Sequence, residues 1–125
     1  ALDRAPIVPK EAILKEAMEK MGQFHLGIVC VVDADKSLLG ILTDGDIRRK
    51  LLKVQKPFSA LLVDDVLDHA FRTPTTIDPD DTLVRAVELM EEKQIWDLPV
   101  VSNEGALVGL LHLHPAVQAL LGIAK

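Results

Sequence analysis

The chain has 125 residues, 49% hydrophobic and 26% charged, a composition typical of a folded soluble domain rather than a disordered segment. Its net charge of -5 argues against a general nucleic-acid binder, because such proteins need clustered Lys and Arg. The single cysteine, Cys30, excludes a disulfide framework and a cysteine-based zinc site. No apolar run approaches the ~18–20 residues that a membrane span needs, and Ala1–Arg4 lacks the layout of a signal peptide, so we expect a cytoplasmic protein.

The sequence repeats itself at an offset of 69 residues. Aligned without a gap, residues 10–52 and 79–121 share 11 identities, and these follow helical and strand spacing. We therefore interpret the chain as a tandem duplication. The identical positions are Leu14/Leu83, Ala17/Ala86, Glu19/Glu88, Met21/Met90, Val31/Val100, Val32/Val101, Leu38/Leu107, Gly40/Gly109, Leu42/Leu111, Leu51/Leu120 and Leu52/Leu121.

The first copy predicts five elements in chain order. An extended piece, Pro6–Pro9, precedes a helix from about Lys10 to Gly22, whose apolar residues recur at three- and four-residue spacing. The continuous apolar run 28–32 predicts a buried strand, and residues 38–42 predict a second strand after a turn. A second helix is expected from Asp44 to about Lys53.

The second copy predicts the same order of elements, with Asp or Pro at the expected helix starts. The expected elements are an extended piece at 75–77, a helix capped by Asp80 or Asp81 and ending near Lys93, strands at 98–101 and 107–111, and a last helix at 115–121.

Each copy is thus a β-α-β-β-α unit that is too small to be stable alone. We expect an α/β (α+β) fold in which the two copies pack through their sheets as a pseudo-two-fold pair. The first copy is assigned to residues 1–56 and the second to residues 74–125. Residues 57–73 form the connecting segment, with a short helix expected at 63–67.

Three motifs carry a resemblance to a known family. The duplicated unit, the Leu98–Val101 strand and the Gly40–Ile47 turn resemble a tandem CBS domain pair, also called a Bateman module. The string Thr43–Arg49, followed downstream by Leu111–His114, is most similar to the C-terminal CBS region of arabinose 5-phosphate isomerases (the KpsF/GutQ group). The same Thr-Asp-Gly-Asp-Ile-Arg-Arg string also occurs in CBS pairs of sugar nucleotidyltransferases.

The resemblance implies a regulatory module that binds a nucleotide or nucleotide-sugar between its repeats. The expected ligands are an adenine or cytidine nucleotide or a CMP-linked sugar, with no required cofactor. The parent protein would be a sugar-phosphate isomerase of lipopolysaccharide synthesis, whose upstream catalytic domain is the partner of this module. The alternatives are a structural oligomerisation module with a vestigial site, or the CBS pair of a sugar nucleotidyltransferase. A homodimer is expected in either role, with neither nucleic acid nor membrane as a partner.

The candidate ligand site is the turn from Gly40 to Arg49. A helix N-terminus offers unpaired N–H groups and a partial positive charge, which suit a phosphate. The resemblance implies that Asp46 accepts hydrogen bonds from a ribose diol and that Thr43 contacts the ligand. Both residue types are also favoured at helix starts for capping alone. Arg48 and Arg49 are candidates for a phosphate or an acidic sugar, and the alternative is a solvated pair.

The resemblance also places the base of a nucleotide between strand backbone and the first extended piece. For the Asp46 site this implies contacts near Ile7, Ile28 and Val29. All three are also ordinary core or edge residues. We find no nucleophile–base pair, no P-loop and no G-x-G-x-x-G motif, so we expect no catalytic residue and no enzymatic activity of the chain itself.

The second copy departs from the ligand-binding pattern. His112 stands where the first copy has Thr43, and Pro115 replaces the acidic residue, so we expect two unequal sites. His112 and His114 share a strand end, but two ligands do not make a metal site, and no metal is expected. Trp96 takes the place of Gly27, and we expect it to pack or to contact a second chain.

Overall fold

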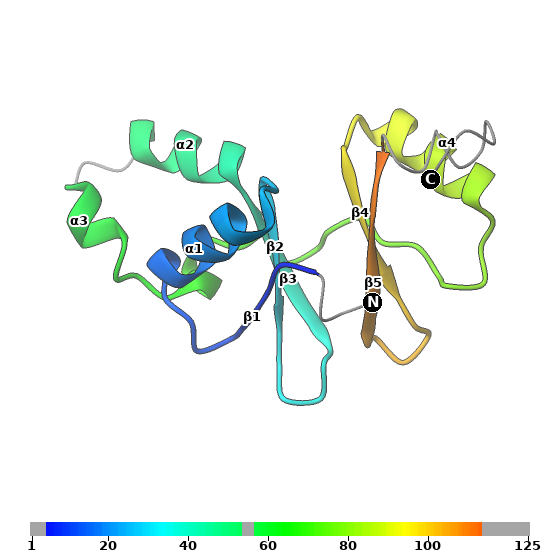
Figure 1. Ribbon diagram of the computed structural model, residues 1–125, viewed down its shortest axis with the longest axis horizontal. Helices are drawn as coiled ribbons and strands as arrows, with labels where there is room; N and C mark the ends of the chain where they lie inside the picture. Colours follow the sequence, from blue (N-terminus) through cyan, green and yellow to red (C-terminus); the bar gives the residue numbers. More distant parts are fainter. Residues whose placement is uncertain (1–4, 54–56, 114–125) are drawn as a thin grey trace. The chain divides into compact units, whose positions relative to one another are not determined.

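A computed structural model of the chain describes residues 5–53 and 57–113. The chain divides into two units, with the boundary between Pro74 and Thr75 (Figure 1). The last expected helix, 115–121, lies outside the described residues.

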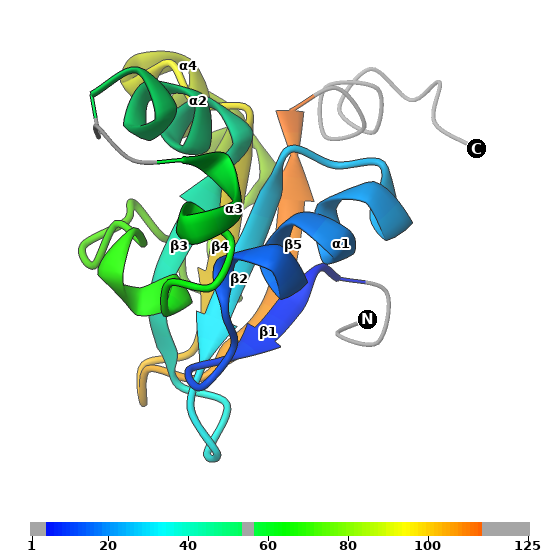
Figure 2. The ribbon, with the colours of Figure 1, turned by 90° about the vertical axis from the view of Figure 1, so that its left-hand side faces the viewer.

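The first unit contains a three-stranded sheet with the strand order β1-β2-β3. β1 runs parallel to β2, and β3 returns antiparallel to it. Helices α1 and α2 lie on one face of this sheet (Figures 1 and 2). The elements of this repeat are β1 (Ile7–Pro9), α1 (Leu14–Phe24), β2 (Ile28–Val32), β3 (Leu38–Thr43) and α2 (Asp44–Lys53).

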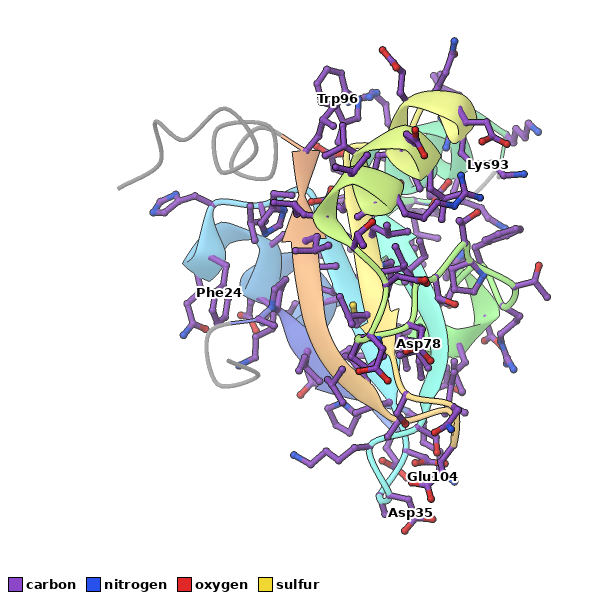
Figure 3. All side chains as sticks on the ribbon, turned by 90° about the vertical axis from the view of Figure 1, so that its right-hand side faces the viewer. Phe24, Asp35, Asp78, Lys93, Trp96 and Glu104 are labelled. Carbon is purple, nitrogen blue, oxygen red and sulfur yellow. The ribbon has the colours of Figure 1, made fainter. Side chains whose placement is uncertain are left out.

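The second unit repeats this arrangement in a reduced form. Helix α4 (Leu83–Lys93) is followed by the antiparallel pair β4 (Asp97–Val101) and β5 (Leu107–His112). In Figure 3, Lys93 marks the end of α4 and Glu104 the turn between the two strands. The expected extended piece is a single parallel bridge from Ile77 to Val100. Ile77 lies 69 residues after Val8, which pairs with Val31 in the first unit, so the bridge is what remains of a strand equivalent to β1.

The two hairpins confirm the duplication at the level of single residues. Both pair in the same register, and both carry a register shift at the same place. The matched positions are Ile28 opposite Thr43 and Asp97 opposite His112, with the shifts at Val31/Val32 and Val100/Val101.

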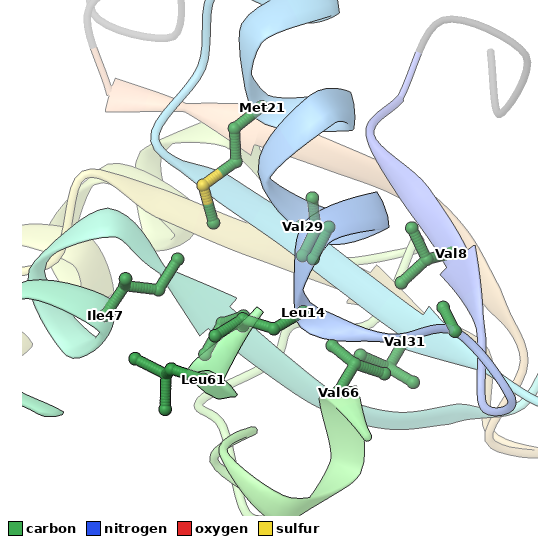
Figure 4. Packing of buried hydrophobic residues seen from close by; sticks show 11 residues of the cluster. Val8, Leu14, Met21, Val29, Val31, Ile47, Leu61 and Val66 are labelled. Atoms are coloured by element: carbon green, nitrogen blue, oxygen red, sulfur yellow. The ribbon is translucent and has the colours of Figure 1, made fainter. Parts of the chain in front are cut away.

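The core of the first unit is aliphatic, as the composition predicts. Every residue of β2 is buried, and Val29 and Val31 pack toward the helices against Leu14 and Ile47 (Figure 4). Met21 closes this cluster from the end of α1.

The connecting segment belongs to the core of the first unit. It forms helix α3 (Phe58–Leu61) and a 3-10 turn, η2 (Val66–Asp68), rather than the single helix expected at 63–67. Leu61 and Val66 are 1% and 0% exposed and lie in the same cluster as Leu14 (Figure 4).

Helix α1 begins and ends later than expected. Its first N–H groups, of Leu14 and Lys15, donate to the carbonyls of Asp64 and Leu62 at 2.8 and 2.9 Å, so the connecting segment sets the start of the helix. The expected stop at Gly22 was wrong. The chain leaves the helix instead through a left-handed residue, His25, with φ 55°.

The expected cap of α4 was also wrong. The hydroxyl of Thr82, rather than Asp80 or Asp81, accepts a hydrogen bond from the N–H of Arg85 at 3.1 Å. The N–H of Asp80 donates to the carboxylate of Asp78, so these residues form a turn before the helix.

Candidate functional site

The structure brings Thr43 and Asp46 together where β3 ends and α2 begins. The N–H of Asp46 donates to the hydroxyl of Thr43 at 3.1 Å, and the N–H of Thr43 donates to the Asp46 carboxylate at 3.3 Å. This reciprocal arrangement is a capping box. Both predicted site residues therefore cap the helix, which does not prevent them from also meeting a ligand.

Asp46 has a second partner that the sequence did not single out. The Arg49 guanidinium donates to Asp46 Oδ1 at 2.5 Å, and the two side chains are 65% and 28% exposed. A carboxylate has about four lone-pair positions, so each Asp46 oxygen keeps acceptor capacity beyond its partner here. The i, i+3 spacing is the sequence signal for this pair. Arg48 is exposed, and its ligand role stays a prediction.

Gly27 leaves room for the first residue of α2. A Cβ atom at Gly27 would lie 2.9 Å from the carboxylate of Asp44, and the N–H of Asp44 donates to the Gly27 carbonyl at 2.9 Å. The missing side chain thus leaves room for the Asp44 carboxylate beside residue 27.

The three residues expected near a base lie in different places. Ile28 is directly opposite Thr43 in the sheet, and its side chain is 1% exposed. Val29 is buried in the core cluster against the helices. Ile7 is half-buried on β1, two strands away from Thr43. Only Ile28 adjoins the Thr43 turn through strand pairing, and contact of any of the three with a ligand stays a prediction.

Asp46 also lines a hollow of about 390 Å³ within the first unit. The sequence pattern does not reveal this hollow, because part of its wall comes from the connecting segment. Its other lining residues are Arg49, Lys50 and Lys53 of α2, and His69, Ala70 and Phe71.

The corresponding turn of the second unit has different chemistry. His112 Nδ1 hydrogen-bonds to the carboxylate of Asp97, its neighbour across the hairpin. The N–H of Leu113 donates to the carbonyl of Trp96 at 2.8 Å, which matches the contact between Asp44 and Gly27. The Trp96 side chain points away from α4 and the residue is 74% exposed (Figure 3).

Within residues 5–53 and 57–113, no three His, Cys, Asp or Glu side chains gather as a metal site, and His114 lies outside this part. Cys30 is buried in β2. None of the helices in the described part of the chain is long and apolar enough to cross a membrane.

Comparison with known proteins identifies the family. A family model for the CBS domain matches residues 2–53 and again residues 63–114. The chain belongs to the CBS-domain family. The two matches and the two structural repeats together confirm the expected CBS pair.

The relatives of this CBS pair include longer proteins. An uncharacterised protein of Chlamydia muridarum is 32% identical over 117 residues, which cover 91% of this chain and 35% of that protein. Arabinose 5-phosphate isomerase GutQ of Shigella flexneri is 31% identical over 117 residues, covering 94% of this chain and 35% of that enzyme. The chain therefore spans about a third of the length of these curated relatives.

A solved structure is similar along nearly the whole chain. The structure of CBSX2 in complex with AMP matches with a TM-score of 0.83 and 26% identity, covering 97% of this chain and 90% of that chain. A CBS pair that is similar in fold and sequence thus holds an adenine nucleotide.

Proposed function

We propose that this CBS pair is a regulatory module that binds an adenine nucleotide, such as AMP, at the Thr43–Asp46 turn. The observation that carries the proposal is the pairing of the Asp46 carboxylate with the Thr43 hydroxyl at the start of α2, in a chain similar to a CBS pair solved with AMP. The remaining acceptor positions of Asp46 suit the two hydroxyls of a ribose. The Thr43 hydroxyl accepts from Asp46 N–H, so its own proton is available for a phosphate oxygen.

The proposed role is regulation rather than catalysis. A ligand regulates an attached domain only if it binds two arrangements of the protein with different affinity. The similarity to GutQ supports a sugar-phosphate isomerase as the parent protein, with this CBS pair as about a third of its length. The ligand would then report on the supply of nucleotides or on a product of the sugar pathway.

Calorimetry of the chain with AMP, ATP, CMP and a CMP-linked sugar acid tests the proposal. Asp46→Ala removes charged hydrogen bonds, and we expect AMP affinity to fall about 10- to 100-fold. Asp44→Ala is the matched control, because it removes an exposed carboxylate two residues earlier on the same helix. No heat with any of the four ligands, or equal weakening by both substitutions, would contradict the proposal.

Exposed apolar side chains support a second candidate function, an oligomerisation module. In the first unit Leu52, Val63 and Phe58 are 82%, 64% and 44% exposed, and in the second unit Trp96 is 74% exposed. An exposed apolar surface that is continuous is typical of a face that meets another chain. Sedimentation velocity distinguishes the two candidates: a stable dimer without response to nucleotide supports oligomerisation alone, and a monomer contradicts it.

A further inference from the structure

One hollow of the first unit combines three cations with a buried histidine. Its volume is about 390 Å³. One wall is helix α2, where Asp46, Arg49, Lys50 and Lys53 follow i, i+3, i+4 and i+7 spacing and therefore share a face. The opposite wall is the segment 69–71.

That second wall is fixed to the sheet. Phe71 and Ile41 of β3 exchange both backbone hydrogen bonds, at 2.7 and 3.0 Å. Phe71 is also 54% exposed, so its ring offers an apolar surface beside the cations. The hollow is thus formed by two elements whose positions the fold determines.

The cations of this face lie beyond the first turn of α2. The first turn carries two carboxylates, Asp44 and Asp46, so the basic side chains that line the hollow come from its later turns. Arg49 is paired with Asp46, while Lys50 and Lys53 lie further along. At 1.5 Å per residue, Lys53 is about 10 Å from Asp46 along the axis, so the basic end of the hollow is separate from the Thr43 turn.

His69 supplies a buried polar group in the same wall. Its side chain is 9% exposed, and Nε2 lies 2.8 Å from the Asp64 carboxylate. Because a carboxylate accepts, Nε2 carries the proton of this bond. Nδ1 is buried and has no hydrogen-bond partner within the described residues. In the neutral ring Nδ1 is therefore an acceptor that is costly to leave unsatisfied, and the O–H of a singly protonated phosphate is a donor of the kind that it lacks.

We propose that this hollow binds the phosphate group of a phosphorylated small molecule. Lys50 and Lys53 neutralise the phosphate, Arg49 donates through its remaining N–H groups, and the ring of Phe71 covers the body of the ligand. The site does not require a nucleoside, so it goes beyond the proposed function. Because Asp46 lines the hollow too, the group comes either from a separate phosphomonoester or from the nucleotide itself.

Inorganic phosphate is the probe for the first test, added to the full chain at constant ionic strength and followed by amide NMR. We expect saturable shifts at Lys50, Lys53 and Phe71. The double variant K50M/K53M should weaken phosphate binding about 10-fold or more, since it removes two charged contacts.

The double variant K10M/K15M is the control. It loses the same charge from exposed lysines that do not line the hollow, and its phosphate affinity should stay within about twofold of the original chain. The amide spectrum of each variant reports whether it is folded. Shifts that do not saturate, unchanged binding in K50M/K53M, or equal weakening in both double variants would each overturn the proposal.

A second titration separates the two sources of the phosphate group. AMP is added to the chain with and without saturating phosphate. Competition assigns the hollow to the phosphate of the nucleotide, and independent binding assigns it to a separate phosphomonoester. Phosphate binding without any AMP binding would defeat the proposed function and leave this site standing. AMP binding that K50M/K53M leaves unchanged, together with no saturable phosphate binding, would overturn this site and leave the proposed function standing.

Discussion

Asp46 combines two roles that ask for the same chemistry. As the third residue of α2 it closes the capping box with Thr43, and it also pairs with Arg49. A capping carboxylate and a ribose-binding carboxylate both need to be an ionised acceptor at a helix start. The proposed site is therefore held in place by its own structural function.

At the scale of single residues, Gly27 provides a sharp prediction. Gly27→Ala places a Cβ 2.9 Å from the exposed Asp44 carboxylate, which must turn away, and we expect a loss of up to about 1 kcal/mol in the free energy of unfolding. In an Asp44→Ala background the same substitution should cost much less, because the crowding group is gone. Urea denaturation of the four proteins of this cycle measures the coupling.

Gly22→Ala is the control for this cycle. Gly22 lies inside α1 with nothing within 4 Å of an added Cβ, so this substitution should stabilise the chain by about 0.5–1 kcal/mol. Additive effects of Gly27→Ala and Asp44→Ala would show that the close approach is not what the glycine provides.

The candidate site could be predicted from the sequence in part. The string around Thr43 and Asp46 indicates a helix start, because capping has a strong local signature. Asp46 pairs with Arg49 because residues three apart are neighbours on a helix surface. This spacing distinguishes Arg49 from Arg48 once the helix is assigned. The positions of His69 and Phe71 could not be predicted from the sequence, since only the folding of the connecting segment brings them opposite α2.

At the scale of elements, α1 and α4 end in the same way. His25 and Gln94 occupy equivalent positions and both have φ 55°, in the left-handed region. In each case the following N–H reaches back into the last turn, as Leu26 does to Met21 at 3.1 Å, which is a Schellman motif. Two residues with a Cβ thus hold positions that glycine adopts with less strain.

We expect His25→Gly and Gln94→Gly each to raise the free energy of unfolding by about 0.5–1 kcal/mol. Gln23→Gly is the matched control, because it puts glycine at an exposed position inside α1, where it should cost about 1 kcal/mol. Thermal denaturation of the three variants checks the signs. A loss of stability in His25→Gly would mean that the imidazole makes a contact worth more than the relieved strain.

The elements of the repeats were more predictable than their ends. The strand bounds at 28–32 and the helix at 44–53 agree with the structure, because β-branched runs and a local cap define them. The start of α1 could not be predicted from the sequence, since its first N–H groups donate to the carbonyls of Leu62 and Asp64 in the connecting segment. The connecting segment has no counterpart in the duplication, so symmetry could not help there.

Leu61→Ala tests whether the connecting segment is part of the core. Leu61 is 1% exposed within the cluster of the first unit, and we expect a cost of about 2–4 kcal/mol in the free energy of unfolding. Val63→Ala is the control two residues later, where the side chain is 64% exposed and the change should stay within about 0.5 kcal/mol. Similar midpoints for both variants in urea would show that this segment is only a tether.

At the scale of the whole molecule, the chain is a duplication whose copies differ in sequence at the turn that we propose to bind the ligand. The shared hairpin register shows that the strands leading into this turn pair in the same way as far as Thr43 and His112. The side chains differ: Thr43 and Gly27 correspond to His112 and Trp96, and Pro115 replaces the acidic residue. The acidic residue that we propose to bind a ribose is thus present in one copy and absent from the other.

We therefore expect one nucleotide per chain. Calorimetric titration with AMP should give a stoichiometry near one, and Asp46→Ala should weaken this one site about 10- to 100-fold. No second site replaces it, because His112 is already engaged with Asp97 and a proline side chain cannot accept a hydrogen bond from a ribose hydroxyl. The double substitution His112→Thr and Pro115→Asp restores the residue types of the first copy and should add a second, weaker site. Trp96 occupies the place of Gly27, so full equality of the two sites would further need Trp96→Gly. Two equal sites in the original chain would contradict this asymmetry, and so would AMP binding that Asp46→Ala leaves unchanged but His112→Ala removes.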